Sequence, residues 1–109
     1  MATMVFVEWP GITREQYDRI MSALSFATNP PSGAVSHCAG FTPHGIRVVD
    51  VWDSRDLFEQ FQRTRLTPAV QQAGVTTQPK VEFLEVYRAE PPIDVLKHAA
   101  SQATGSRSR

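Results

Sequence analysis

The chain is poor in the features that mark disulfide-stabilised, membrane-spanning and nucleic-acid-binding proteins. Its 109 residues include a single cysteine, Cys38, so no disulfide can form within the chain, as is usual in a reducing compartment. Eleven basic residues balance eleven acidic ones, and no run of Lys or Arg lies in the part expected to fold, which argues against a nucleic-acid partner. No segment approaches the ~18 apolar residues of a membrane helix, and the N-terminus shows no signal-peptide pattern. These absences predict a cytoplasmic protein with no membrane partner.

Motifs for bound cofactors are also missing. The sequence has no phosphate-binding loop, no Gly-rich nucleotide fingerprint and no serine elbow. His37, Asp50 and a glutamate would supply the ligand types of a facial metal triad, but nothing in their spacing demands a metal. We therefore expect no metal and no cofactor.

The overall composition is that of one soluble globular domain, with 41% hydrophobic and 20% charged residues. Residues 1–90 carry the periodic patterns described below and are predicted to form this domain. Residues 91–109 are predicted to be a tail, with a short helix over residues 93–102 and a disordered end.

Four segments rich in β-branched and aromatic residues predict strands at residues 3–9, 34–41, 45–52 and 79–89. A helix is predicted to open at Thr13, because Gln16 stands where a capping box requires it. Its apolar face has the spacing i, i+3, i+4, i+7 and consists of Tyr17, Ile20, Met21 and Leu24.

A second helix follows the third strand. Either Asp53 or Ser54 caps it, and Asp53 is preferred because Trp52 and Leu57 could then form a hydrophobic staple. Pro68 is expected to interrupt this helix, leaving a short helical turn over residues 67–72. The buried face of the second helix would consist of Leu57, Phe58 and Phe61.

The element order β-α-β-β-α-β predicts an α+β protein with a ferredoxin-like antiparallel sheet and both helices on one face. The first strand is apolar on both sides, with Val5 and Val7 opposite Met4 and Phe6. Strands of this kind are buried on both faces, and two helices can cover only one. We therefore expect a second copy of the chain to cover the outer face, which makes the protein a homodimer.

Asp50 stands in the middle of an apolar strand, where a carboxylate must face water, a partner or a polar cavity. If four residues link the second and third strands, His37 lies directly opposite Asp50. A two-residue loop at residues 44–45 would place His37 opposite Trp52 and diagonal to Asp50, and a three-residue loop would separate the pair.

A carboxylate beside an imidazole fixes the tautomer of the ring and suits it to general-base catalysis. His37 and Asp50 are therefore the candidate catalytic pair, and the alternative is a structural cross-strand pair. Cys38 is expected to be a small buried residue, and His44 an exposed turn residue. The candidate ligand-binding residues are Trp52, Tyr17, Phe41 and Glu85, with a core role for the aromatics and a solvated role for Glu85, as for Glu8, as the alternatives.

Several segments resemble the antibiotic-biosynthesis-monooxygenase-like (ABM-like) small proteins of the dimeric α+β barrel superfamily. They are GIRVVDVWDSRDLFEQF at residues 45–61, RLTPAVQQAG at 65–74, VEWPGITREQYDRI at 7–20 and NPPSGAVSHCAG at 29–40, and the resemblance covers roughly residues 3–88. It implies a homodimer whose sheets pair into a barrel, with a small cavity between sheet and helices in each subunit. The superfamily includes cofactor-independent monooxygenases, haem-degrading enzymes, polyketide cyclases and isomerases, so it leaves the reaction open.

The chain departs from two patterns of this superfamily. Haem-degrading members use a histidine on the second helix, and residues 54–74 contain none. Quinone-forming oxygenases use an Asn with a Trp, whereas Asn29 is the only asparagine here and Trp52 matches only in residue type. The resemblance implies a small cofactor-independent monooxygenase, cyclase or isomerase acting on an aromatic or polyketide-like molecule. The alternative is a non-catalytic dimeric module with a ligand-binding or structural role.

Overall fold

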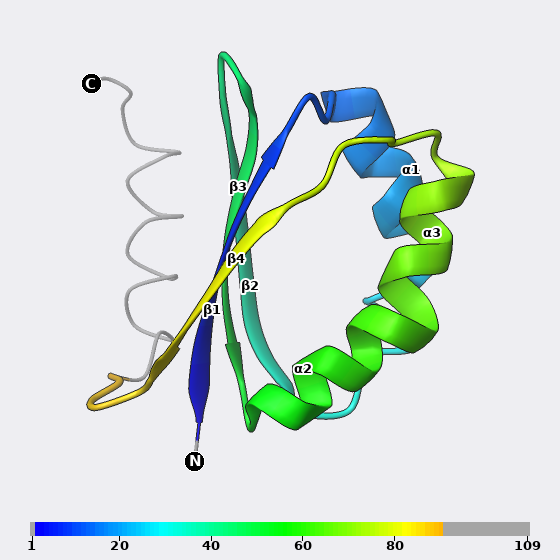
Figure 1. The fold of residues 1–109 in the computed structure, drawn as a ribbon. Coiled ribbons are helices and arrows are strands. Elements are labelled where there is room, and N and C mark those ends of the chain that lie inside the picture. Colours follow the sequence, from blue (N-terminus) through cyan, green and yellow to red (C-terminus); the bar gives the residue numbers. More distant parts are fainter. Residues whose placement is uncertain (1, 91–109) are drawn as a thin grey trace, which may run out of the picture.

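A computed structural model describes residues 2–90 as a two-layer α+β fold. A four-stranded antiparallel sheet has the strand order β2-β3-β1-β4, and the helices of these residues lie on one of its faces (Figure 1). This arrangement confirms the predicted ferredoxin-like fold. The elements in chain order are β1 (Thr3–Pro10), α1 (Arg14–Leu24), β2 (Ala34–Thr42), β3 (Gly45–Trp52), α2 (Arg55–Phe61), the π-helical turn η1 (Gln62–Leu66), α3 (Thr67–Gln72) and β4 (Lys80–Glu85).

The helix and disordered end predicted for the tail lie outside the described residues. The division into a domain of residues 1–90 and a tail of residues 91–109 therefore stays a prediction.

Helix α1 begins with the predicted capping box. The Thr13 hydroxyl accepts a hydrogen bond from the Gln16 amide nitrogen, and the Gln16 side chain accepts one from the Thr13 amide. The helix ends at Ser25, a non-glycine residue in the left-handed region with φ of 52°. This turn redirects the chain so that the next residue, Phe26, packs against the core.

Helix α2 is capped by Ser54, so the preference for Asp53 was wrong. The Ser54 hydroxyl accepts a hydrogen bond from the Leu57 amide at 3.2 Å. The Asp53 amide instead donates to the Gly33 carbonyl at 2.7 Å, which ties Asp53 to the preceding loop. Tertiary pairing of the strand end therefore decides which of the two residues begins the helix.

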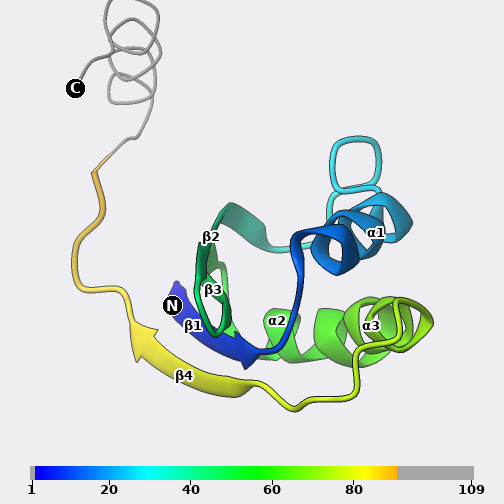
Figure 2. The same ribbon diagram turned by 90° about the horizontal axis from the view of Figure 1, so that it is seen from above.

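The interruption expected at Pro68 takes the form of a π turn and leaves the chain helical. The Thr67 amide donates to the Gln62 carbonyl, five residues back, in the turn η1. Pro68 then occupies the first turn of α3, where its missing N–H costs little. Figure 2 shows the result, a long helical segment from α2 to α3 that lies beside α1 over the sheet.

The core lies between the sheet and this helical layer. Val5 and Trp52 are fully buried, and the rings of Phe58 and Phe61 pack on Trp52 at centroid distances of 5.5 and 5.2 Å. Gly45 begins β3 with φ of 151°, and a Cβ there would clash with the Trp9 carbonyl, so only glycine fits. The predicted helical face of Phe58 and Phe61 is confirmed.

No helix of residues 2–90 covers the outer face of the sheet. Within these residues the face exposes apolar side chains, among them Val49 and Leu84. Cys38 is also exposed there, which corrects the expectation that it is buried, because its side of the edge strand β2 faces away from the helices.

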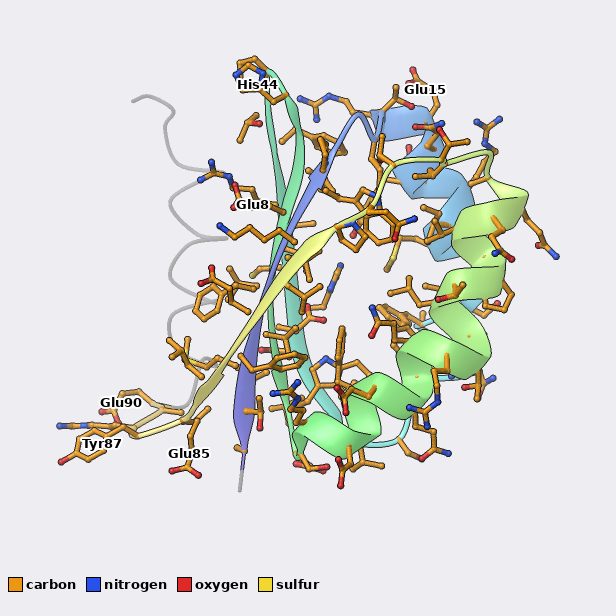
Figure 3. The ribbon with its side chains drawn as sticks, in the orientation of Figure 1. Glu8, Glu15, His44, Glu85, Tyr87 and Glu90 are labelled. Carbon is orange, nitrogen blue, oxygen red and sulfur yellow. The ribbon has the colours of Figure 1, made fainter. Side chains whose placement is uncertain are left out.

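Strand β4 is shorter than predicted, because its ladder with β1 runs only from Lys80 to Glu85. Tyr87 consequently lies beyond the sheet and is fully exposed (Figure 3).

Candidate acid–base site

The β2–β3 hairpin sets the geometry of the candidate site. Phe41 pairs with Ile46, which places His37 directly opposite Asp50. This is the pairing predicted for a four-residue loop, and an additional pair between Thr42 and Gly45 tightens the turn. Both side chains therefore point into the helix-covered side of the sheet.

Asp50 is buried, with only 7% of its surface exposed, and each of its carboxylate oxygens accepts a hydrogen bond. Oδ1 lies 2.7 Å from Nδ1 of His37, and Oδ2 accepts the indole N–H of Trp52 at 3.1 Å. Two donors on two oxygens stabilise the ionised carboxylate in this apolar strand. Asp50 thus faces a polar partner inside the fold.

The partners of the His37 ring assign its tautomer. The carboxylate of Asp50 can only accept, so Nδ1 carries the proton in the neutral ring. Nε2 then presents a lone pair and lies 2.7 Å from the hydroxyl of Tyr17, which donates to it. A continuous chain of hydrogen bonds therefore runs from α1 through β2 and β3, from Tyr17 to His37, Asp50 and Trp52.

The hydroxyl of Tyr17 is held in its protonated form. Burial raises the pKa of Tyr17 above its ordinary value, and the negative charges of Asp50 and Asp18 raise this pKa further. Tyr17 is therefore a hydrogen-bond donor that keeps its proton at neutral pH.

A small cavity of about 70 Å³ lies over this chain, between the sheet and the helices. His37 reaches it from the sheet and is part-exposed, whereas Tyr17 reaches it from α1. Apart from Tyr17, His37 and Asp50 its walls are largely apolar, which strengthens electrostatic interactions inside it. The apolar and aromatic walls include Val7, Trp9, Met21, Phe26, Val48 and Phe61.

The structure brings together three of the predicted site residues, Tyr17, His37 and Asp50. Trp52 also contacts Asp50, but it lies beneath the cavity and holds the carboxylate in place. Phe41 packs edge-on against the ring of Tyr17 at a centroid distance of 6.0 Å, outside the cavity wall.

The structure does not bring Glu85 to the other site residues. It is exposed at the end of β4, away from the helices (Figure 3). Glu8 points to the outer face of the sheet, where it forms an ion pair with Arg47 at 3.3 Å.

Phe26 is a site residue that sequence reasoning missed. Its ring lies edge-on to His37 at 5.6 Å and against Phe61 at 5.7 Å, so it covers one side of the imidazole. It lies in the loop after α1, and no helical or strand periodicity marks it. The left-handed turn at Ser25 directs the Phe26 ring toward the core, and no residue pattern in the sequence predicts that turn.

Within residues 2–90, no group of three His, Cys, Asp or Glu side chains is arranged to hold a metal ion. No helix of the same residues is long and apolar enough to cross a membrane.

Comparison with known proteins yields similar folds. No protein-family model matches the chain, and no curated protein matches it significantly. Among solved structures, SnoaB, a cofactor-independent oxygenase from Streptomyces nogalater, is 16% identical, with 83% of this chain and 96% of SnoaB covered and a TM-score of 0.55. The NE2512 protein of unknown function from Nitrosomonas europaea is 24% identical, with 84% and 92% covered and a TM-score of 0.59.

A dimeric ferredoxin-like protein of unknown function from Jannaschia sp. CCS1 is also similar. It is 15% identical, with 79% of this chain and all of that chain covered and a TM-score of 0.52. At these identities the likeness shows the fold. The chain shares the ferredoxin-like fold of these proteins, which is the fold that the resemblance of its sequence implies.

Proposed function

We propose that this protein is a small cofactor-independent enzyme that removes a proton from an aromatic or polyketide-like molecule. The observation that carries the proposal is the hydrogen-bonded chain of Tyr17, His37 and Asp50 at the wall of an apolar cavity. An imidazole with an unprotonated Nε2, oriented by a buried carboxylate, is the arrangement that general-base catalysis needs. The oxygenase SnoaB, which shares the fold, is a cofactor-independent enzyme.

In this mechanism the acidic C–H or O–H of the substrate displaces the Tyr17 hydroxyl from Nε2 of His37. Nε2 then accepts a proton from an acidic C–H or O–H of the substrate, and Asp50 stabilises the resulting imidazolium at Nδ1. The displaced Tyr17 hydroxyl, which keeps its proton at neutral pH, donates to the oxygen on which negative charge develops.

The carbanion has two courses open to it. In a cyclase or isomerase, it attacks a carbonyl of the same molecule or takes the proton back from His37 at another carbon. In a monooxygenase, the carbanion gives its electrons to dioxygen, a C–O bond forms, and the peroxide anion takes the proton back from His37 to become a hydroperoxide. Loss of one water molecule from the hydroperoxide then leaves a new carbonyl group. Oxygen uptake separates the two courses.

We propose further that the working unit is a homodimer. The exposed apolar side chains on the outer face of the sheet, Val49 and Leu84 among them, support this assembly, and the similar Jannaschia protein is dimeric. The cytoplasmic location expected from the single cysteine stays a prediction.

A second function, a non-catalytic dimeric module with a ligand-binding or structural role, is favoured by two observations. The cavity of about 70 Å³ is smaller than ligand pockets of roughly 300–1,000 Å³, so Phe26 and its loop must move before a ring system enters. Tyr17 also already satisfies His37, as it would in a purely structural network.

Anthrone, whose ring CH₂ group is acidic, tests both functions. In D₂O without oxygen, NMR follows the exchange of this CH₂ group, and the variant His37→Gln is compared with His44→Gln, which changes the exposed turn histidine. We expect exchange above the buffer rate that His37→Gln lowers by about 100-fold and that His44→Gln leaves unchanged. Exchange that does not depend on His37 would contradict general-base catalysis. Binding of anthrone without exchange would also contradict it, and the non-catalytic module would then be the supported function.

A further inference from the structure

Within residues 2–90, Arg65 is a positive charge that has no negatively charged partner. It projects from η1, is half-buried, and lies over the ring of Phe61 at 5.7 Å. Among residues 2–90 it forms no ion pair with a carboxylate. A guanidinium removed from water usually has an acidic partner, because desolvation of an unpaired charge is costly.

Part of the Arg65 guanidinium has a structural role. Its Nη2 atom donates to the carbonyl of Leu24 at 2.6 Å and to the carbonyl of Asn29 at 2.9 Å. These bonds hold both ends of the segment that carries Phe26. Nε and Nη1 make no hydrogen bond within the part of the chain that the structure describes, so three N–H donors remain for a ligand.

A hollow of about 210 Å³ lies beside Arg65, between residues 29–32 and the helical segment of α2 and η1. Its lining is rich in polar groups that suit an anion. A volume below the roughly 300 Å³ of a ligand pocket fits the head group of a larger molecule. The polar lining residues are Asn29, Ser32, Gln60, Thr64 and Arg65.

The hollow and the acid–base cavity share a wall. Phe61 lines both of them, and its ring lies near both the guanidinium of Arg65 and the ring of Phe26. Phe26 in turn lies against His37. A ligand with its anionic end at Arg65 would therefore place its apolar body against Phe61, the ring that stands between the hollow and the acid–base cavity.

We propose that the hollow beside Arg65 binds the carboxylate of an organic acid, so that the substrates of this protein are aromatic or polyketide-like acids. The inference rests on the proposed function for the reaction at His37. The carboxylate accepts charge-assisted hydrogen bonds from Nε or Nη1 of Arg65, the donors that the loop leaves unused.

Binding of phenylacetate, compared with its neutral analogue phenylacetamide, tests the proposal by NMR titration. We expect the wild type to bind phenylacetate about tenfold more tightly than the amide. Arg65→Gln is expected to remove this preference, and Arg63→Gln, which deletes an exposed charge two residues away, is expected to keep it. Equal affinity of the wild type for the two compounds, or a preference that survives Arg65→Gln, would overturn the proposal.

Gln60→Glu is a second variant that tests the same site if Arg65→Gln fails to fold. It places a carboxylate in the hollow while Arg65 continues to hold the loop, so the preference for phenylacetate should disappear. Gln71→Glu makes the same charge change on the exposed surface of α3 and should keep the preference. A preference that persists in Gln60→Glu would contradict the site.

Inorganic phosphate is the second probe. We expect phosphate to displace phenylacetate poorly, because contact of the phenyl ring with the aromatic wall adds binding affinity that inorganic phosphate does not gain. Displacement of phenylacetate by an equal concentration of phosphate would overturn the assignment to organic acids.

The test separates the anion site from the proposed reaction. His37→Gln should keep the preference for phenylacetate, and neutral anthrone reports on His37 without needing Arg65. If the preference depends on Arg65 but anthrone exchange does not depend on His37, the proposed reaction is wrong and the anion site stands.

Discussion

The two faces of the sheet differ in how well their side chains are partnered within residues 2–90. On the inner face, each polar group of the candidate site has a partner, and Asp50 alone satisfies both His37 and Trp52. On the outer face, apolar side chains such as Val49 and Leu84 have no cover among residues 2–90. The inner face is complete within residues 2–90, whereas the outer face is uncovered in this part of the chain. The proposed chemistry and the proposed assembly therefore lie on different faces, and substitutions on one face should leave the other intact.

Asp50→Asn should have the largest effect on the inner face. The amide cannot accept from both His37 and Trp52 as a carboxylate does, so buried donors lose a charged partner. We expect unfolding free energy to fall by about 3 kcal/mol in urea denaturation. Asp53→Asn, an exposed carboxylate three residues on, is the control and should change stability little. An equal effect of the two substitutions would show that Asp50 has no special structural role.

Leu84→Glu should act on the outer face alone. A charge at this exposed apolar position disfavours burial against a second copy, and we expect the dimer dissociation constant to rise by about 30-fold, or about 2 kcal/mol. Sedimentation velocity measures the change, and Gln72→Glu on the helical layer is the control. A wild type that is monomeric at every concentration would contradict the proposed dimer.

Phe26→Ala should open the site. The ring is only half-buried, so a loss of about 1.5 kcal/mol is expected, below the 3–5 kcal/mol of a fully buried phenylalanine. The enlarged cavity should bind anthrone more tightly, as measured by NMR titration. Weaker binding of anthrone would mean that Phe26 is a contact for the ligand and does not obstruct its entry.

Tyr17→Phe should have the smallest effect at neutral pH, about 1 kcal/mol for one hydrogen bond. Its pH dependence is more informative. The folded protein raises the pKa of Tyr17, so its contribution to stability is complete below the ordinary tyrosine pKa and is lost as pH rises through the folded value. The stability gap between wild type and Tyr17→Phe should therefore close at alkaline pH.

Tyr87→Phe, which makes the same change at a fully exposed position, is the control for this titration. A gap between wild type and Tyr17→Phe that widens at alkaline pH would contradict the raised pKa.

Local signals made most of the fold predictable. The Thr13 capping box and the alternation of apolar residues in strands depend on neighbouring residues only, and both appear in the structure as expected. The choice between Asp53 and Ser54 as helix cap failed, because it depends on a hydrogen bond to Gly33 from a distant part of the chain. The end of β4 was also missed, because it depends on where β1 begins.

The same distinction applies to the candidate site. Opposition of His37 and Asp50 follows from the hairpin register, and Asp50 itself drew attention because it is a carboxylate in an apolar strand. The contact between Tyr17 and His37 needs the packing of α1 on β2, which no spacing along the chain encodes. Phe26 and Arg65 were missed for this reason, since both act through a loop whose path is set by tertiary contacts.

The tautomer of His37, measured by ¹⁵N NMR of the imidazole at neutral pH, tests the central claim most directly. A base oriented by Asp50 must carry its proton on Nδ1 and keep Nε2 as an acceptor, whereas the exposed His44 provides the reference in the same spectrum. We predict an Nδ1–H signal for His37 that is lost in Asp50→Asn. A proton on Nε2 in the wild type would contradict the account.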